Sequence, residues 1–285
     1  MQRLSGVLAM GSPKRSRPAG VAFLTGLVVV MLVGLCIAKG RLNPTSGFQV
    51  LALLLAVCAA TLGRWVTGYW RGVLIDGRNK LSLSRLQAVA WTILVLAGYG
   101  TAVLANVRSD RTKAFDVSVP EELWLAMGIS IVSLVGSPLI KLKKQEAGTP
   151  REAAQRHAKW ALTNRQVAVG ARAEGVLVAL GSASAASWTD LFEGEEVGNA
   201  GLVELGKFQM FMFTMLLIAG YGLMLATTFS AYRGAITALP ALSGGAIALL
   251  GISHAGYLAD KSAPHTPVAE TTNPQPTVLA AGRGS

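Results

Sequence analysis

The sequence is poor in charge, in histidine and in cysteine, and each shortage narrows what the protein can be. Charged residues make up 14% of the chain, against about 25% in soluble proteins. Two cysteines are too few for a disulfide framework. The chain has only three histidines, and no HExxH, GxSxG or Walker-type motif occurs. We therefore predict a protein that is not an enzyme and needs no cofactor or metal ion.

Long apolar runs are what the chain does have. A helix of about twenty apolar residues crosses a bilayer, and six stretches approach or reach this length. These stretches are residues 19–38, 47–70, 86–107, 123–140, 208–232 and 239–258. The sequence predicts an all-α integral membrane protein with about six transmembrane helices. A secretory signal peptide is the rival interpretation of the first run, but no A-x-A site follows it.

One apolar segment occurs twice. Residues 83–100 and 205–222 align without a gap, and eight of the eighteen positions are identical, including the run Ala-Gly-Tyr-Gly. Sparser matches continue into the next helix, where Pro120, Ser133 and Lys141 align with Pro240, Ser253 and Lys261. The sequence predicts a duplicated helical hairpin in which the second helix of each copy begins at a proline. Because each copy crosses the membrane twice, both should point the same way.

The residues shared by the two copies form two stripes on a helix. The first stripe consists of Gln87, Trp91, Leu94 and Gly98, matched by Gln209, Phe213, Leu216 and Gly220. The second consists of Thr92 and Tyr99, matched by Thr214 and Tyr221. Two preserved stripes predict helices that pack against protein on two sides, with both tyrosines in structural roles. We expect the two glycines to let the helices approach and the two glutamines to bond to each other; a polar pair lining a pore is the alternative.

Basic residues indicate the orientation. With six crossings, twenty of the 26 basic residues fall on one side, which places both termini in the cytoplasm of a cell with a plasma (inner) membrane. The same loops are expected to contact anionic lipid, so we predict no nucleic-acid partner despite the net charge of +11. The predicted division of the chain is a disordered basic tail at 1–18, an N-terminal transmembrane hairpin at 19–70, repeat A at 71–144, a cytoplasmic loop at 145–197, repeat B at 198–261 and a disordered tail at 262–285.

The longest polar region, residues 141–207, separates the two copies. Residues 151–165 are predicted to form a soluble helix, and residues 175–188, too short to span, an interfacial or packed segment. The acids Asp190, Glu193, Glu195 and Glu196 are predicted to form a solvated turn, with a divalent-cation site as the alternative.

Two further side chains are singled out by their place in the apolar runs. His254 lies about one turn inside the last run, and a functional role is the alternative to a hydrogen bond with backbone or headgroup. Cys36 and Cys58 should lie at different depths, so no disulfide is expected between them.

The motifs Ser-x-Ser-Arg-x-Gln-x-x-x-Trp-Thr, from Ser82, and Gly-Ile-Ser-x-Ala-Gly-Tyr, from Gly251, resemble segments of bacterial multi-pass membrane proteins. The resemblance covers residues 76–105 and 190–261 at most. It implies a membrane location but no activity, cofactor or site residue.

Three functions remain compatible with the sequence. A membrane anchor or scaffold is favoured, with residues 141–207 facing a cytoplasmic or envelope protein partner. A passive channel of packed helices, or of several copies of the chain, is the first alternative. A small-solute transporter is the second, since such proteins keep ionisable groups within the membrane and the later apolar runs offer His254 alone.

Overall fold

The computed structural model is mostly helical (70%). It describes residues 17–109, 111–146, 155, 171–231 and 234–266. Its long helices are α1 (Arg17–Ala38), α2 (Pro44–Thr67), α3 (Leu83–Ser109), α4 (Glu121–Glu146), α6 (Leu205–Ser230) and α7 (Gly244–Ser262). Its short elements are η1 (Gly72–Leu74), η2 (Arg111–Lys113), β1 (Arg172–Glu174), β2 (Leu177–Ala179), η4 (Ala183–Ala185) and η5 (Trp188–Leu191).

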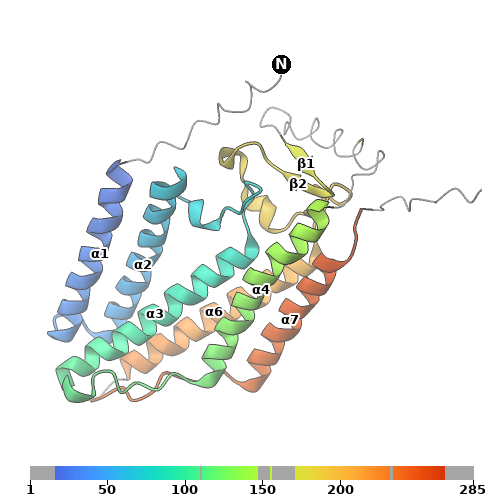
Figure 1. The fold of residues 1–285 in the computed structure, drawn as a ribbon. Coiled ribbons are helices and arrows are strands. Elements are labelled where there is room, and N and C mark those ends of the chain that lie inside the picture. The colour runs from blue at the N-terminus through green and yellow to red at the C-terminus, as the bar shows by residue number, and fades with distance from the viewer. Residues whose placement is uncertain (1–16, 110, 147–154, 156–170, 232–233, 267–285) are drawn as a thin grey trace, which may run out of the picture.

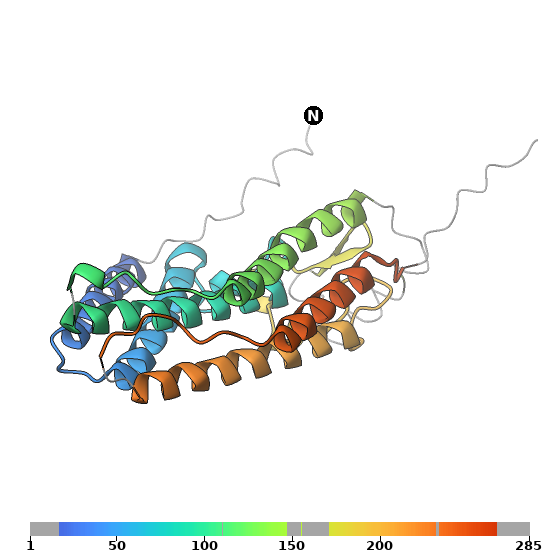
Figure 2. The same ribbon diagram turned by 90° about the horizontal axis from the view of Figure 1, so that it is seen from below.

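The long helices form one bundle with an added hairpin. α3, α4, α7 and α6 pack in a ring of neighbours, while α1 and α2 pack on each other and on α3 (Figure 1). Seen from below, α3 and α4 form one layer and α6 and α7 the other (Figure 2). Between α3 and α6 the interior contains the rings of Trp91 and Tyr221, whose centroids are 6.5 Å apart. Leu225 of α6 is buried beside Gly98 of α3, so large side chains occupy this seam.

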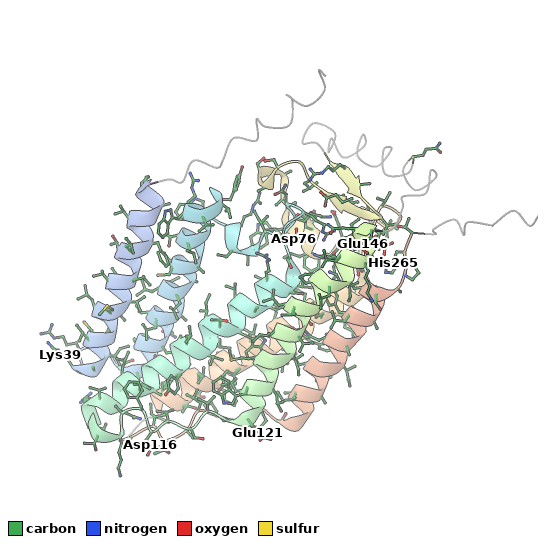
Figure 3. All side chains as sticks on the ribbon, viewed as in Figure 1. Lys39, Asp76, Asp116, Glu121, Glu146 and His265 are labelled. Atoms are coloured by element: carbon green, nitrogen blue, oxygen red, sulfur yellow. The ribbon has the colours of Figure 1, made fainter. Side chains whose placement is uncertain are left out.

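Five of these helices, α1, α2, α3, α4 and α6, are long and apolar enough to cross a membrane. The polar side chains labelled in Figure 3 lie at the two ends of the bundle, with Asp76, Glu146 and His265 at one end and Lys39, Asp116 and Glu121 at the other. α7 is not among the five apolar helices, and its last two turns carry Asp260 and Lys261. A sixth crossing therefore stays a prediction.

Helix ends differ from the predicted ones where capping chemistry was overlooked. The second helix begins early because Asn43 caps it and Pro44 occupies its first turn, and it ends at Gly68, whose φ of 85° suits glycine. The last helix was predicted to begin near Pro240. That prediction is wrong, because Ser243 is the N-cap and its side chain accepts a bond from Ala246.

The segments before α4 and α7 lie side by side at the end of the bundle opposite Asp76. The amide of Ser118 donates to the carbonyl of Thr237, and Ser118 accepts in turn from Leu239. Tyr221 donates to the carbonyl of Pro240. The extended chain around Pro240 is thus held by hydrogen bonds rather than by helix.

At the other end, two segments cover the helix ends, and we call residues 71–82 and 171–204 together the cap. The cap contains the antiparallel pair β1 and β2, joined through Gly175 at φ 60°, and all of β2 is buried. The predicted packed segment at 175–188 is confirmed for residues 176–180, which are buried, whereas Ser184 and Trp188 are exposed. The predicted soluble helix at 151–165 lies outside the described residues, apart from residue 155 alone. Cys36 and Cys58 are both free, as expected.

Candidate functional site: a charge cluster beneath the cap

Glu195 lies at the centre of a group of charged side chains under the cap. Its carboxylate is 2.6 Å from the guanidinium of Arg78 and 2.7 Å from the ammonium of Lys261. The ammonium groups of Lys207 and Lys141 follow at 3.2 and 3.3 Å. These four cations come from the loop before α3 and from the cap-side ends of α7, α6 and α4. One carboxylate therefore connects four separate elements.

Further acids complete the cluster. Asp76 pairs with Lys141 at 2.8 Å and with Arg78 at 3.2 Å. Elsewhere in the cap, Glu196 pairs with Lys144, and Asp190 lies 3.7 Å from Lys80. Most of these side chains are nearly inaccessible, so their charges face one another rather than water. Buried charges are tolerated when they are paired in this way.

The cations decide the protonation of the two central acids. Burial alone would raise the pKa of the Glu195 carboxyl, because the charged form loses its hydration. Lys141, Lys207, Lys261 and Arg78 outweigh that effect and hold the pKa of Glu195 well below its usual range. The pKa of Asp76 is likewise lowered, against the effect of burial, by Lys141 and Arg78. Both groups are anionic at neutral pH and act as fixed charges, not as proton donors.

The backbone of the cap is tied to the same cluster. The amide of Val178 donates to the carbonyl of Glu195, and the amide of Leu180 donates to the carbonyl of Arg78. Asp190 accepts a bond from the amide of Ser187, the N-cap of η5, and also from the amide of Leu81 at 3.1 Å. The prediction that residues 190–196 form a solvated turn is therefore wrong. Asp190, Glu195 and Glu196 pair with basic side chains that are close in space but distant in the sequence.

The glutamine prediction is also wrong. Gln87 is fully buried, and its side-chain amide donates to Thr214 at 2.8 Å and to the carbonyl of Met210 at 3.2 Å. Gln209 is exposed on the outer side of α6. The two copies thus meet through different stripes, the first stripe of α3 against the second stripe of α6.

The remaining stripe residues follow this division. In α3, Trp91, Leu94 and Gly98 are buried while Thr92 is exposed and Tyr99 is half-buried. In α6, Thr214 and Tyr221 are buried, while Leu216 and Gly220 are exposed and Phe213 is half-buried. A rotation of one helix relative to its copy changes which stripe is covered, so identical residues do not share one environment.

His254 is buried in the seam between α4 and α7. Its Nδ1 is 2.6 Å from the hydroxyl of Ser133, and its Nε2 has no hydrogen-bond partner within the described part of the chain. One turn nearer the cap, Tyr257 accepts a bond from Lys261 at 2.7 Å and lies 3.4 Å from the hydroxyl of Ser137. Polar contacts therefore extend from the charge cluster into this seam.

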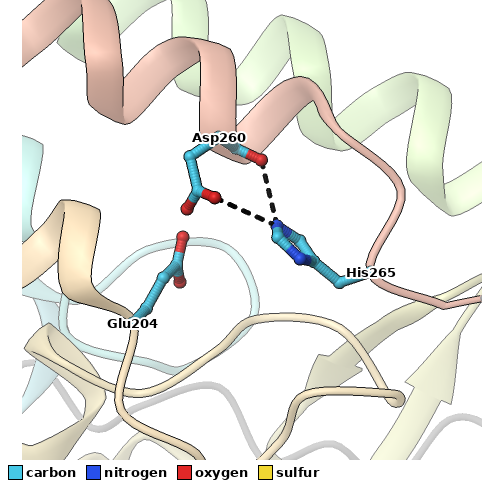
Figure 4. A group of neighbouring side chains, drawn as sticks. All are labelled: Glu204, Asp260 and His265. Carbon is cyan, nitrogen blue, oxygen red and sulfur yellow. Dashed lines mark hydrogen bonds and ion pairs between the residues drawn. The ribbon is translucent and has the colours of Figure 1, made fainter.

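A possible metal site lies at the edge of the cluster. Ligand atoms of Glu204, Asp260 and His265 lie within 4.8 Å of one another (Figure 4). Burial is the main cause that raises the pKa of Glu204, and nearby Asp260 adds to it. The three side chains could hold a divalent cation, but Lys207, 3.3 Å from Glu204, already supplies a positive charge there. The sequence did not indicate this group because Glu204 is far from Asp260 and His265 in the chain.

No family model, curated protein or solved structure matches the chain.

Proposed function

We propose that the protein is a non-enzymatic, multi-pass platform in the plasma (inner) membrane, with the cap facing the cytoplasm and a protein partner bound there. The observation that carries the proposal is the convergence of Arg78, Lys141, Lys207 and Lys261 on Glu195. This contact holds the cap in one position on the helix ends. A rigid surface loses little conformational entropy when a partner binds to it.

The cap also presents an anchor of the kind that protein interfaces favour. The side chain of Trp188, in η5, is 55% exposed although its neighbours Asp190 and Leu191 are buried. Tryptophan is enriched at protein interfaces because it contributes a large apolar area. Within residues 141–207, we therefore place the partner-binding surface around Trp188.

Site-specific photocrosslinking tests the platform in native membranes. A photoreactive residue at Trp188 should give one discrete adduct. The same residue at Phe115, which is exposed and directly precedes Asp116 at the opposite end of the bundle (Figure 3), should not. Glu195→Gln should remove the Trp188 adduct, because the cap then loses its fixed position. Adducts of equal yield at both positions would contradict the proposal.

The arrangement of the four-helix bundle supports a duplicated origin within the same proposal. Lys141 and Lys261, which align in the sequence, both reach Glu195, and the aligned segments around Ser118 and Ala238 pair directly. Both features are expected if α3–α4 and α6–α7 are parallel copies of one hairpin.

Transport of protons or a small polar solute is the second candidate, favoured by the pair of Ser133 and His254 inside the bundle. Proteoliposomes containing the purified full chain distinguish it from the platform. A flux above that of protein-free liposomes, lost in His254→Ala, would replace the platform with a transporter. A flux that His254→Ala leaves intact would indicate a channel.

A further inference from the structure

A cavity of about 630 Å³ opens between α3 and α4 at the cap end of the bundle. Its wall nearest the cap includes Asp76, Arg78, Arg85 and Lys141. Its remaining wall is largely apolar and includes Ala88, Val89, Leu134 and Pro138. Leu134 lies seven residues before Lys141 on α4, about 10 Å along the helix axis. The cavity therefore has a charged end at the level of the cap and an apolar end that runs toward the middle of the bundle.

The charged end has positive charge that no described acid neutralises. Arg85 is exposed and forms no ion pair with any residue that the structure describes. Arg78 is 4% exposed, and its Nε lacks a hydrogen-bond partner among the described residues although its other nitrogens are bonded. An anion at this end would meet the free guanidinium of Arg85, with the buried Arg78 guanidinium behind it adding to the local positive charge.

Comparison with the second copy of the helix shows that Arg85 is not used as its counterpart is. Lys207 aligns with Arg85 but is 2% exposed and pairs with Glu195 and Glu204. Arg85 instead stays at the mouth of the cavity. Where one copy buries its cation in the charge cluster, the other leaves a cation available to a ligand.

We propose that this cavity binds one anionic phospholipid, with its phosphate at Arg85 and part of an acyl chain against Ala88, Val89 and Leu134. The combination of a basic end and an apolar wall between helices matches the two parts of a lipid. The proposal requires only that α3 and α4 cross the bilayer with the cap at headgroup level. It holds whether the protein is a platform or a transporter.

Native mass spectrometry of the full chain in mild detergent tests the site, with phosphatidylglycerol and phosphatidylcholine of identical acyl chains as probes. We expect one phosphatidylglycerol to be retained in preference to phosphatidylcholine. Arg85→Gln should lower the affinity for phosphatidylglycerol about fivefold, the effect of losing one basic contact near a headgroup. Arg85→Lys should keep most of the affinity.

Two matched controls separate a site from general attraction. Lys143→Gln removes an exposed cation of α4 that does not line the cavity, and it should leave binding unchanged. Ala88→Phe should weaken binding of both lipids by occupying the apolar wall, whereas Ala219→Phe, on the exposed side of α6, should not. An unchanged melting temperature verifies that each variant is folded.

Three results would overturn the proposal. Equal losses in Arg85→Gln and Lys143→Gln would indicate diffuse charge attraction rather than a site. Equal retention of the two lipids would remove the role of the anionic headgroup. Displacement of phosphatidylglycerol by millimolar inorganic phosphate would assign the cavity to a soluble phosphate compound instead.

Discussion

Glu195 is the single anion that four cationic side chains share, and its removal differs from the loss of an ordinary surface ion pair. Exposed pairs contribute about 0–1 kcal/mol because water competes for both charges. In the cluster, Lys207 and Lys261 are 2% and 5% exposed, so water cannot replace the lost carboxylate. A buried cation without its partner is costly, even where the intact pair contributes little net stability.

We therefore predict that Glu195→Gln lowers the free energy of unfolding by about 3–5 kcal/mol, measured by denaturant titration in mixed micelles. Glu193→Gln is the control, since Lys207 bonds to the carbonyl of Glu193 and not to its carboxylate. The control should change stability by less than about 0.5 kcal/mol. Equal effects of the two variants would show that the cluster does not hold the cap.

Acid should loosen the cap through the same residue and Asp76. Both have pKa values lowered by folding, so their contribution to stability is complete above their ordinary values of 4.5 and 3.8. It is lost as the pH falls through the lowered values. Folding raises the pKa of Glu204, so protonation of Glu204 in mild acid stabilises the folded state and opposes the effect of the other two acids. Stability of the cap should therefore not decline between pH 7 and pH 5, and should fall below about pH 4.5.

Hydrogen exchange measures this directly, after correction for its intrinsic pH dependence. The amides of Val178 and Leu180 bond within the cap and should lose protection in acid. The amide of Ala102, in the middle of α3, should keep its protection over the same range. Simultaneous loss at all three positions would indicate global unfolding and contradict a separate acid response of the cap.

Within the helices, the two copies of the repeated segment provide a matched pair of glycines. A Cβ added to Gly98 would lie 2.9 Å from the Cδ1 of Leu225, whereas a Cβ on Gly220 would meet nothing within 4 Å. Gly98→Leu should therefore destabilise the α3–α6 contact by about 1–3 kcal/mol, the usual cost of overpacking. Gly220→Leu should be nearly neutral when both are measured by unfolding in mixed micelles. The reverse order would contradict the packing of these helices.

The sequence predicts these helices well and their contacts less well. Apolar length identifies α1 to α4 and α6, because a bilayer requires that length whatever the helix touches. Helical periodicity also identifies the stripes that contain Gln87 and Thr214. It cannot show that these two residues bond to each other rather than Gln87 to Gln209, since that depends on the rotation of each helix. The rotation is decided by packing with the rest of the bundle.

The sequence did not predict the charge cluster, for a related reason. In the sequence, Lys141, Lys207 and Lys261 are basic residues at the ends of apolar runs, which is what topology alone requires. Their convergence on Glu195 follows from the folding of the cap, whose short strands and turns carry little periodicity. The aligned positions of Lys141 and Lys261 were the one available signal that two of these lysines would meet.

For the molecule as a whole, the arrangement predicts which end faces the cytoplasm. The cap, the start of α1 and the end of α7 lie at the same end of the bundle (Figure 1). The excess of basic residues predicts that this end faces the cytoplasm. In a variant without Cys36 and Cys58, a cysteine at Ser118 should react with an impermeant thiol reagent added to intact cells. A cysteine at Ser184, exposed on the cap, should react only after permeabilisation. The opposite pattern would invert the orientation.

The shared contacts of Glu195 have a consequence for biosynthesis. The ribosome makes Glu195 before Lys207 and Lys261, so a chain that has just completed the cap still lacks two of its four cationic partners. The cluster can close only after α7 has been synthesised and has taken its place beside α4. Until then Glu195 has only Arg78 and Lys141 as cationic partners. Closure of the cap thus reports, on the cytoplasmic side of the proposed topology, that every helix of the bundle has been made and assembled.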